Sequence, residues 1–172
     1  MEYLHGRNPS VIHRDIKSQN VLVSKDGQVK LCDFGLVESK ITTAGTPSYM
    51  APELLENGHF SRKVDVYAFA ILFWEMFTNT VPFQSWGIAD IREFVIQGNR
   101  LKLPYEDCPK LCCKLIEKCW DQDAQKRPEF KNVSLALERI YSSIREVSHT
   151  VEVHGIDGDS FDQLTASVQK KK

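Results

Sequence analysis

The sequence has little charge imbalance and no long uninterrupted apolar run. The formal net charge is −1 over 172 residues, so we expect neither a nucleic acid nor a membrane surface as partner, because both attract strongly basic chains. The longest apolar run, residues 64–77, is interrupted by Asp65 and Glu75. A run of that length is typical of a buried helix and is too short for a membrane span.

The cysteines also lack a recognisable pattern. There are five of them, an odd number, and the adjacent Cys112 and Cys113 do not have the C-x-x-C spacing of a zinc site. Residues 1–10 are polar and include Pro9, unlike a secretory signal. We therefore expect a cytoplasmic or nuclear protein with buried thiols rather than disulfides.

The residues that are present predict a mainly α domain with one small β-hairpin near its start. Apolar runs at 21–23 and 29–31 flank Asp26 and Gly27, which together are a hairpin turn signal. Apolar residues at helical spacing, with Pro and Gly as breakers, predict helices at residues 1–5, 52–57, 61–78, 88–97, 109–119 and 128–147. The composition then becomes polar, which predicts one domain over residues 1–147 and a disordered tail over 148–172.

Two of these helices are indicated by apolar residues at helical spacing. In the helix that begins near Pro109, the spacing places Leu111 on one face with Leu115, Ile116 and Cys119. The helix before it is marked by Ile88, Ile91 and Val95 and by the stop at Gly98.

Three short blocks occur in order along the chain. They are His-Arg-Asp-Ile-Lys-Ser-Gln-Asn at 13–20, Asp-Phe-Gly at 33–35 and Ala-Pro-Glu at 51–53. Each block alone is weak evidence, but their order and spacing make the set specific. The set resembles the signature of eukaryotic protein kinases. The resemblance covers about residues 1–147 and implies the helical carboxyl-terminal lobe of a kinase.

The resemblance implies roles for five residues. Phosphoryl transfer depends mainly on positioning and charge neutralisation. Asp15 would orient the substrate hydroxyl and accept its proton, and Lys17 would contact the transferred phosphate. Asn20 and Asp33 would hold Mg²⁺ through oxygen ligands, and Leu22 would lie beneath the adenine ring. The implied cofactors are therefore ATP and Mg²⁺.

Neighbouring residues have implied supporting roles. A histidine beside a catalytic aspartate suggests a general base, but the resemblance favours His13 packing near Phe34 instead. Arg14 would receive a phosphate on the activation loop through charge-assisted hydrogen bonds. Thr46 would bond both the catalytic aspartate and the lysine two residues after it.

The loop between the second and third blocks contains the expected modification sites. Thr42 and Thr43 are the best phosphosite candidates, with Ser39 as a further one. The alternative is an unmodified polar loop, because Ser and Thr are ordinary loop residues. Cys32 would lie near the nucleotide, where inert packing is favoured over a reactive thiol.

Three charged residues are expected to hold the scaffold. Asp65 lies in an apolar helix, where its burial would be costly without hydrogen bonds. The resemblance implies that it bonds the backbone near residues 13–14, and that Arg127 forms a buried ion pair with Glu53.

The same resemblance implies the class of substrate. Lys17 and the run at 45–53 are typical of kinases that phosphorylate Ser and Thr in proteins. The runs at 65–75 and 119–120, with Arg127 and Pro128, resemble the tyrosine-kinase-like group. The implied partners are therefore protein substrates with Ser or Thr acceptors.

The signature is incomplete in this sequence. No G-x-G-x-x-G precedes the first block, and neither the strand lysine nor the helix glutamate of the amino-terminal lobe is present. We therefore expect a kinase fragment without that lobe, inactive alone. The alternative is a non-catalytic lobe that serves as a binding or regulatory module.

Overall fold

The computed structural model describes the backbone of residues 1–34 and 45–154, with side chains as far as residue 145. The chain divides into two compact units, Met1–Val133 and Ser134–Lys172. The first unit contains every candidate site residue that the structure describes.

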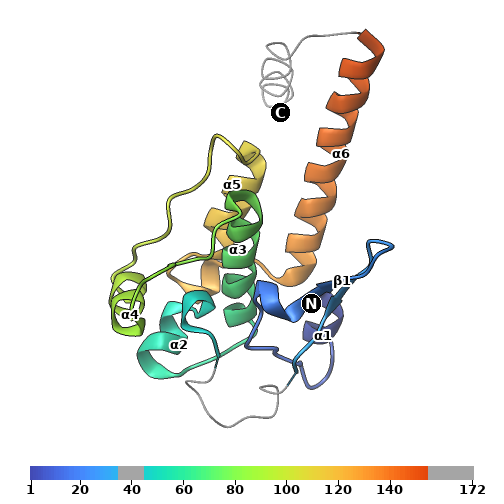
Figure 1. Ribbon diagram of the computed structural model, residues 1–172. Coiled ribbons are helices and arrows are strands. Elements are labelled where there is room, and N and C mark those ends of the chain that lie inside the picture. The colour runs from blue at the N-terminus through green and yellow to red at the C-terminus, as the bar shows by residue number, and fades with distance from the viewer. Residues whose placement is uncertain (35–44, 155–172) are drawn as a thin grey trace. The chain divides into compact units, whose positions relative to one another are not determined.

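The first unit begins with a short helix and the predicted hairpin (Figure 1). The helix α1 (Glu2–His5) ends at Gly6, and the 3-10 turn η1 (Ser18–Asn20) leads directly into β1 (Val21–Val23). β1 pairs antiparallel with β2 (Val29–Leu31). Gly27 has a φ of 79° in the connecting turn, a conformation that glycine adopts without a steric penalty. The hairpin prediction is confirmed.

Two helices follow residues 35–44, which lie outside the described part of the chain. The turn η2 (Pro47–Tyr49) precedes α2 (Pro52–Asn57), which ends at Gly58 in the left-handed conformation. The helix α3 (Lys63–Thr78) begins where Ser61 Oγ accepts a hydrogen bond from the backbone N–H of Lys63 at 3.2 Å. Such a side-chain bond satisfies a donor at the start of the helix.

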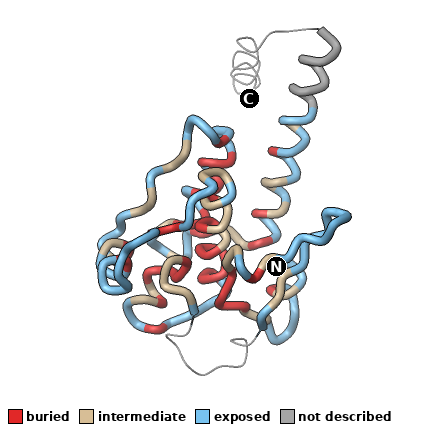
Figure 2. The backbone as a smooth tube through the Cα atoms, viewed as in Figure 1, coloured by how far each residue is buried: buried red, intermediate tan, exposed pale blue. Residues whose placement is uncertain are grey.

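The helix α3 is the centre of this unit's core. Nine of its 16 residues are buried, and it packs against α5 (Lys110–Cys119), η2 and η3 (Ala124–Lys126). Figure 2 shows buried residues concentrated along it. A helix that is apolar on nearly every side belongs in such a position, as the sequence predicted.

The helices α4 (Ile88–Ile96) and α5 each bury one face. α4 packs against α2 and η2. Ile88 and Leu111 are 68% and 40% exposed, so Leu111 does not share the buried face of α5 on which its spacing placed it. Ile88 is the first residue of its helix. Leu111 lies at the edge of the buried face of α5, which is centred near Cys112 and Cys119, because successive helical residues are about 100° apart.

The last helix, α6 (Phe130–His154), crosses from the first unit into the second. It begins two residues after Pro128 and extends past residue 147, where the sequence predicted that the domain ends. Tyr141 and Ile144 are exposed on it. Polar residues such as Glu and Arg favour helices, so loss of apolar pattern need not end one. The rest of the predicted tail, residues 155–172, lies outside the described residues.

The five cysteines are free thiols, and the predicted burial is confirmed for four of them, whereas Cys32 is half-buried. Burial raises the pKa of Cys119 to about 12. Within residues 1–34 and 45–154, no helix combines the length and the apolar character needed to cross a bilayer.

Candidate active site

The buried carboxylate of Asp65 holds the turn that carries Asp15. Asp65 is fully buried in α3. Its Oδ2 accepts the backbone N–H of His13 at 2.9 Å, and its Oδ1 accepts that of Arg14 at 2.8 Å. Arg14 has a φ of 67°, which is strained for a residue with a side chain. The predicted contact between Asp65 and this backbone is therefore present, and it stabilises a strained turn.

A third donor to the same carboxylate was missed by the sequence reasoning. Nε2 of His5, a buried residue in α1, lies 2.8 Å from Asp65 Oδ2. The two residues are 60 positions apart. A histidine near the end of a short helix carries no sequence signal of such a bond, and only the fold brings it to Asp65.

Three side chains meet at Asp15. Lys17 Nζ lies 2.7 Å from its Oδ2, and Thr46 Oγ1 donates to its Oδ1 at 3.0 Å. Lys17 Nζ also donates to Thr46 Oγ1 at 2.9 Å, so both contacts predicted for Thr46 are present. Asn20 Nδ2 donates to the backbone carbonyl of Asp15 at 2.8 Å and to its Oδ2 at 3.1 Å.

These donors set the charge state of the carboxylate. Burial by itself would raise the pKa of Asp15, but hydrogen bonds from Lys17, Thr46 and Asn20, with the charge of Lys17, outweigh it and hold the pKa below its ordinary value. Asp15 is therefore ionised at neutral pH and can accept a hydrogen bond from a hydroxyl.

Asn20 and Asp33 are brought together by backbone pairing next to the hairpin. The N–H of Cys32 donates to the carbonyl of Asn20 at 2.9 Å, and the exposed Asp33 follows directly. The amide nitrogen of Asn20 bonds Asp15, which leaves its Oδ1 for a cation.

This donor set fits Mg²⁺, which takes a few hard oxygen ligands from protein and keeps others from water or phosphate. Within the described residues, no group of three or more His, Cys, Asp or Glu side chains is arranged to hold a metal ion. A protein-only cage is therefore not present in that part of the chain.

His13 has the packing role that the sequence favoured. Its Nδ1 accepts the backbone N–H of Asp15 at 3.3 Å, so its other nitrogen carries the proton and donates to the carbonyl of Cys32 at 3.0 Å. The ring lies edge-on to Phe34 with centroids 4.8 Å apart. Since both nitrogens are occupied, the imidazole is not placed to act as a general base.

The contacts of the other predicted residues do not test the roles that the resemblance implies for them. Leu22 is 54% exposed on β1, and the guanidinium of Arg14 lies 4.4 Å from the ring centroid of Phe60. Thr42, Thr43 and Ser39 lie outside the described residues. Phosphate recognition by Arg14 and the adenine contact of Leu22 therefore stay predictions.

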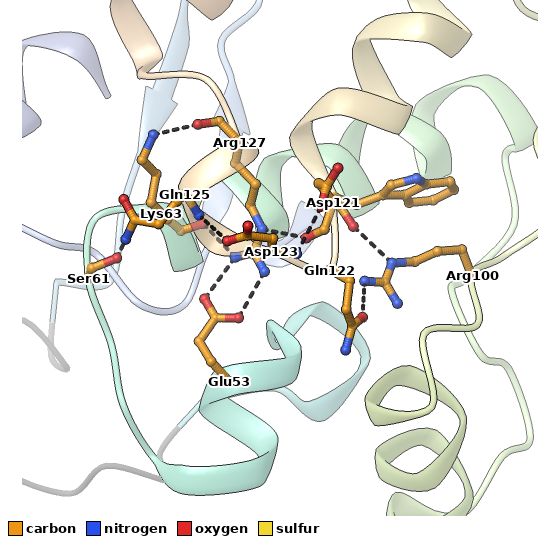
Figure 3. Close-up of polar contacts among 10 residues, drawn as sticks. Glu53, Ser61, Lys63, Arg100, Asp121, Gln122, Asp123, Gln125 and Arg127 are labelled. Atoms are coloured by element: carbon orange, nitrogen blue, oxygen red, sulfur yellow. Dashed lines mark hydrogen bonds and ion pairs between the residues drawn. The ribbon is translucent and has the colours of Figure 1, made fainter.

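The predicted ion pair between Glu53 and Arg127 is present (Figure 3). Two guanidinium nitrogens of Arg127 each donate to one oxygen of Glu53 at 2.8 Å. The remaining nitrogen, Nε, donates to the carbonyl of Asp121 at 2.8 Å, and Nη1 also reaches the carbonyl of Lys63 at 3.1 Å. Lys63 in turn donates to the carbonyl of Arg127. The pair thus joins α2, the start of α3 and the segment before α6.

A second polar cluster beside the site was also missed. It consists of Ser18 in η1, Tyr49 in η2 and Glu75 in α3. A glutamate in an otherwise apolar helix is a weak signal that could have directed attention to it.

Comparison with known proteins agrees with the motifs. Residues 1–137 match the family model described as protein tyrosine and serine/threonine kinase. This range includes the Asp15 cluster, Asp33 and both members of the Glu53–Arg127 pair.

Individual relatives are similar over most of the chain. It is 39% identical over 151 residues to the serine/threonine-protein kinase CTR1 of Arabidopsis thaliana, covering 83% of this chain and 18% of that protein. It is 39% identical over 153 residues to the serine/threonine/tyrosine-protein kinase HT1 of the same plant, covering 85% and 38%. It is 39% identical over 151 residues to the dual specificity protein kinase shkC of Dictyostelium discoideum, covering 81% and 30%. The chain thus spans well under half the length of each of these relatives.

Proposed function

Because this chain belongs to the protein tyrosine and serine/threonine kinase family, we propose that its site transfers the γ-phosphate of ATP to Ser and Thr hydroxyls of proteins. The observation that carries the proposal is the convergence of Lys17, Asn20 and Thr46 on Asp15. Three donors hold the carboxylate, and Asp65 in the core holds the strained turn that carries it. Such a carboxylate has the fixed position that is needed to orient an acceptor hydroxyl.

The geometry supports a role for each residue. Asp15, ionised because its pKa is lowered, would accept a hydrogen bond from the acceptor hydroxyl and orient its oxygen toward the phosphate. A weakly basic carboxylate takes the proton late, as the new bond to phosphorus forms. Lys17 would place a positive charge beside the transferred group. Mg²⁺ held by Asn20 and Asp33 would neutralise charge on the phosphates when bound.

Ser and Thr are the proposed acceptors, in proteins of the cytoplasm or nucleus. Lys17 and Thr46 are the residue types that the sequence associated with this specificity, and they bond each other at 2.9 Å. Two of the relatives carry names that include tyrosine or dual specificity. The assay below therefore offers tyrosine acceptors as well.

The test measures phosphate transfer from labelled Mg²⁺–ATP to peptide pools with Ser, Thr or Tyr as the sole acceptor. The 172-residue chain is assayed alone and fused behind the amino-terminal lobe of CTR1. We expect transfer to Ser and Thr only in the fused form, because the chain lacks the Gly-rich loop. Asp15→Asn should lower that rate by about a thousandfold or more, since orientation of the nucleophile is lost.

The matched control is Asp107→Asn, which removes an exposed carboxylate outside the site and should leave the rate unchanged. A fused protein that is folded but transfers no phosphate, beside an active CTR1 kinase domain, would contradict the proposal. That result would favour the non-catalytic lobe as a binding or regulatory module.

A further inference from the structure

One carboxylate beside the candidate active site binds hydroxyl groups from two separate turns. Ser18 Oγ donates to Oε1 of Glu75 at 3.0 Å, and the phenol of Tyr49 donates to Oε2 at 2.6 Å. The two hydroxyl oxygens lie 3.3 Å apart. Ser18 belongs to η1 and Tyr49 to η2, while Glu75 lies one turn before the end of α3.

The number of available protons fixes the direction of these bonds. Each hydroxyl has a single hydrogen, and both hydrogens are used on Glu75. Burial, and then the hydrogen bond to Glu75, raise the pKa of Tyr49 to about 12, so the phenol keeps its proton at neutral pH. Hydrogen bonds to a charged acceptor are stronger than those between neutral groups. Glu75 therefore acts as a clamp on both turns.

The two clamped turns are the ones that meet at Asp15. Lys17 is the residue at the start of η1, and Thr46 is the residue at the start of η2. These two side chains bond each other and both oxygens of Asp15. Ser18 follows Lys17 directly, so its bond to Glu75 restrains the backbone that carries the lysine.

We propose that Ser18 is a positioning residue, whose bond to Glu75 keeps η1 in register with η2 and so keeps Thr46 on Asp15. This role rests on the phosphoryl transfer proposed above and adds to it a residue that touches none of the reacting groups. Ser18 bonds Glu75, and its effect on Asp15 passes through Thr46.

The decisive measurement is the NMR titration of the Asp15 carboxyl carbon in the 172-residue chain. In Ser18→Ala we expect the pKa of Asp15 to rise toward its ordinary value, because the hydrogen bond from Thr46 lengthens. Ser18→Thr keeps the hydroxyl and should titrate like the parent chain. The control Ser143→Ala removes a hydroxyl that bonds the carbonyl of Arg139 on α6 and should have no effect.

A double substitution separates positioning from a direct electrostatic effect. Thr46→Val removes the donor through which Ser18 is proposed to act, so adding Ser18→Ala to it should shift the titration no further. If Ser18→Ala does not fold, Glu75→Gln serves instead, because it removes the negative charge that strengthens the hydrogen bonds from both hydroxyls. An unchanged titration in the folded single variant, or an equal additional shift in the Thr46→Val background, would overturn the proposal.

Kinetics of the fused protein give a second readout. Ser18→Ala should lower kcat about tenfold, as expected for loss of a bond to a charged group, with the KM for ATP unchanged, and Ser18→Thr should restore it. The titration requires no phosphoryl transfer. An inactive fused protein would therefore count against the proposed function, while the titration would still decide whether Ser18 ties η1 to η2.

Discussion

At the scale of single residues, the buried polar groups of the first unit are mostly matched by specific partners. Asp65 receives three donors and Arg127 donates to Glu53 and two carbonyls. Tyr67 differs, because its ring lies against the guanidinium groups of Arg100 and Arg127 while its hydroxyl has no hydrogen-bond partner among the residues the structure describes. We therefore expect opposite effects on stability from removal of the Tyr67 hydroxyl and from removal of the Arg127 side chain.

Removal of the Tyr67 hydroxyl should not destabilise the protein. A buried hydroxyl without a partner costs free energy, so we expect Tyr67→Phe to have an unfolding free energy at pH 7 equal to or above that of the parent. Burial raises the pKa of Tyr67 to about 12, above its unfolded value near 10. The stability linked to this group is therefore present below pH 10 and lost as the pH rises toward 12. Urea unfolding between pH 9 and 12 should show a smaller loss for the variant, and a large destabilisation at pH 7 would contradict this view.

Removal of the Arg127 side chain should be severely destabilising. Arg127→Ala leaves Glu53 and the carbonyls of Asp121 and Lys63 without their donor, and we expect a loss of about 3–5 kcal/mol of unfolding free energy. Glu53→Gln keeps one acceptor oxygen and should lose less. Urea denaturation at pH 7 measures both variants. An unchanged midpoint for Arg127→Ala would show that the pair does not stabilise the fold.

At the scale of secondary-structure elements, α3 organises the site from within the core. It supplies Asp65 to the turn before Asp15 and Glu75 to η1 and η2. Its first and last turns therefore fix two segments of the site, and most of the apolar residues between them are buried. The hairpin that follows η1 is held more weakly, because β1 and β2 have three residues each and are largely exposed.

A change in the hairpin turn should loosen this element. Gly27 has a φ of 79°, and a Cβ atom there would meet nothing within 4 Å, so the cost of Gly27→Ala is conformational and amounts to about 1 kcal/mol. Gly27→Asn should cost less, because Asn tolerates the left-handed region. Amide hydrogen exchange at Val21 and Leu31 reports the local opening. Equal exchange rates in the parent and Gly27→Ala would rule out this account.

At the scale of the whole molecule, acid should destabilise the protein through carboxylates whose pKa values are lowered by folding. Burial opposes the shift at Asp15, but hydrogen bonds from Lys17, Thr46 and Asn20 outweigh it. A hydrogen bond from Lys63 lowers the pKa of Glu129, which also pairs with Arg62 at 3.0 Å. Stability from such groups is present above their unfolded pKa values and is lost as the pH falls through the lower folded values.

The pH dependence of unfolding should follow from these two groups. The ordinary pKa values are 3.8 for Asp and 4.5 for Glu, and those of Asp15 and Glu129 lie below them in the folded protein, so we expect the unfolding free energy to decrease as the pH falls below about 4.5. Glu129→Gln should flatten part of this decrease, and the effect should be modest because its side chain is 40% exposed. Urea unfolding at pH 7, 5 and 3.5 tests both points. A stability that is constant over this range would contradict the linkage.

Local signals in the sequence were enough to determine the hairpin, the order of the helices and the motif blocks that contain Asp15, Lys17, Asn20 and Asp33. Turn residues, helix breakers and the three motif blocks act over a few positions, so they can be read without the fold. The contacts of Thr46 and of the Glu53–Arg127 pair were also predicted, but from the family resemblance and not from physical reasoning on the residues.

Tertiary structure alone decided the burial of individual side chains and the hydrogen bonds that Asp65 and Glu75 make to the segments around the site. Ile88 and Leu111 fit an apolar spacing, yet they are exposed, because Ile88 is the first residue of α4 and Leu111 lies at the edge of the buried face of α5. The bonds from His5 to Asp65 and from Ser18 and Tyr49 to Glu75 join residues 60, 57 and 26 positions apart. Such contacts depend on how α3 lies in the core, and no pattern over neighbouring residues specifies them.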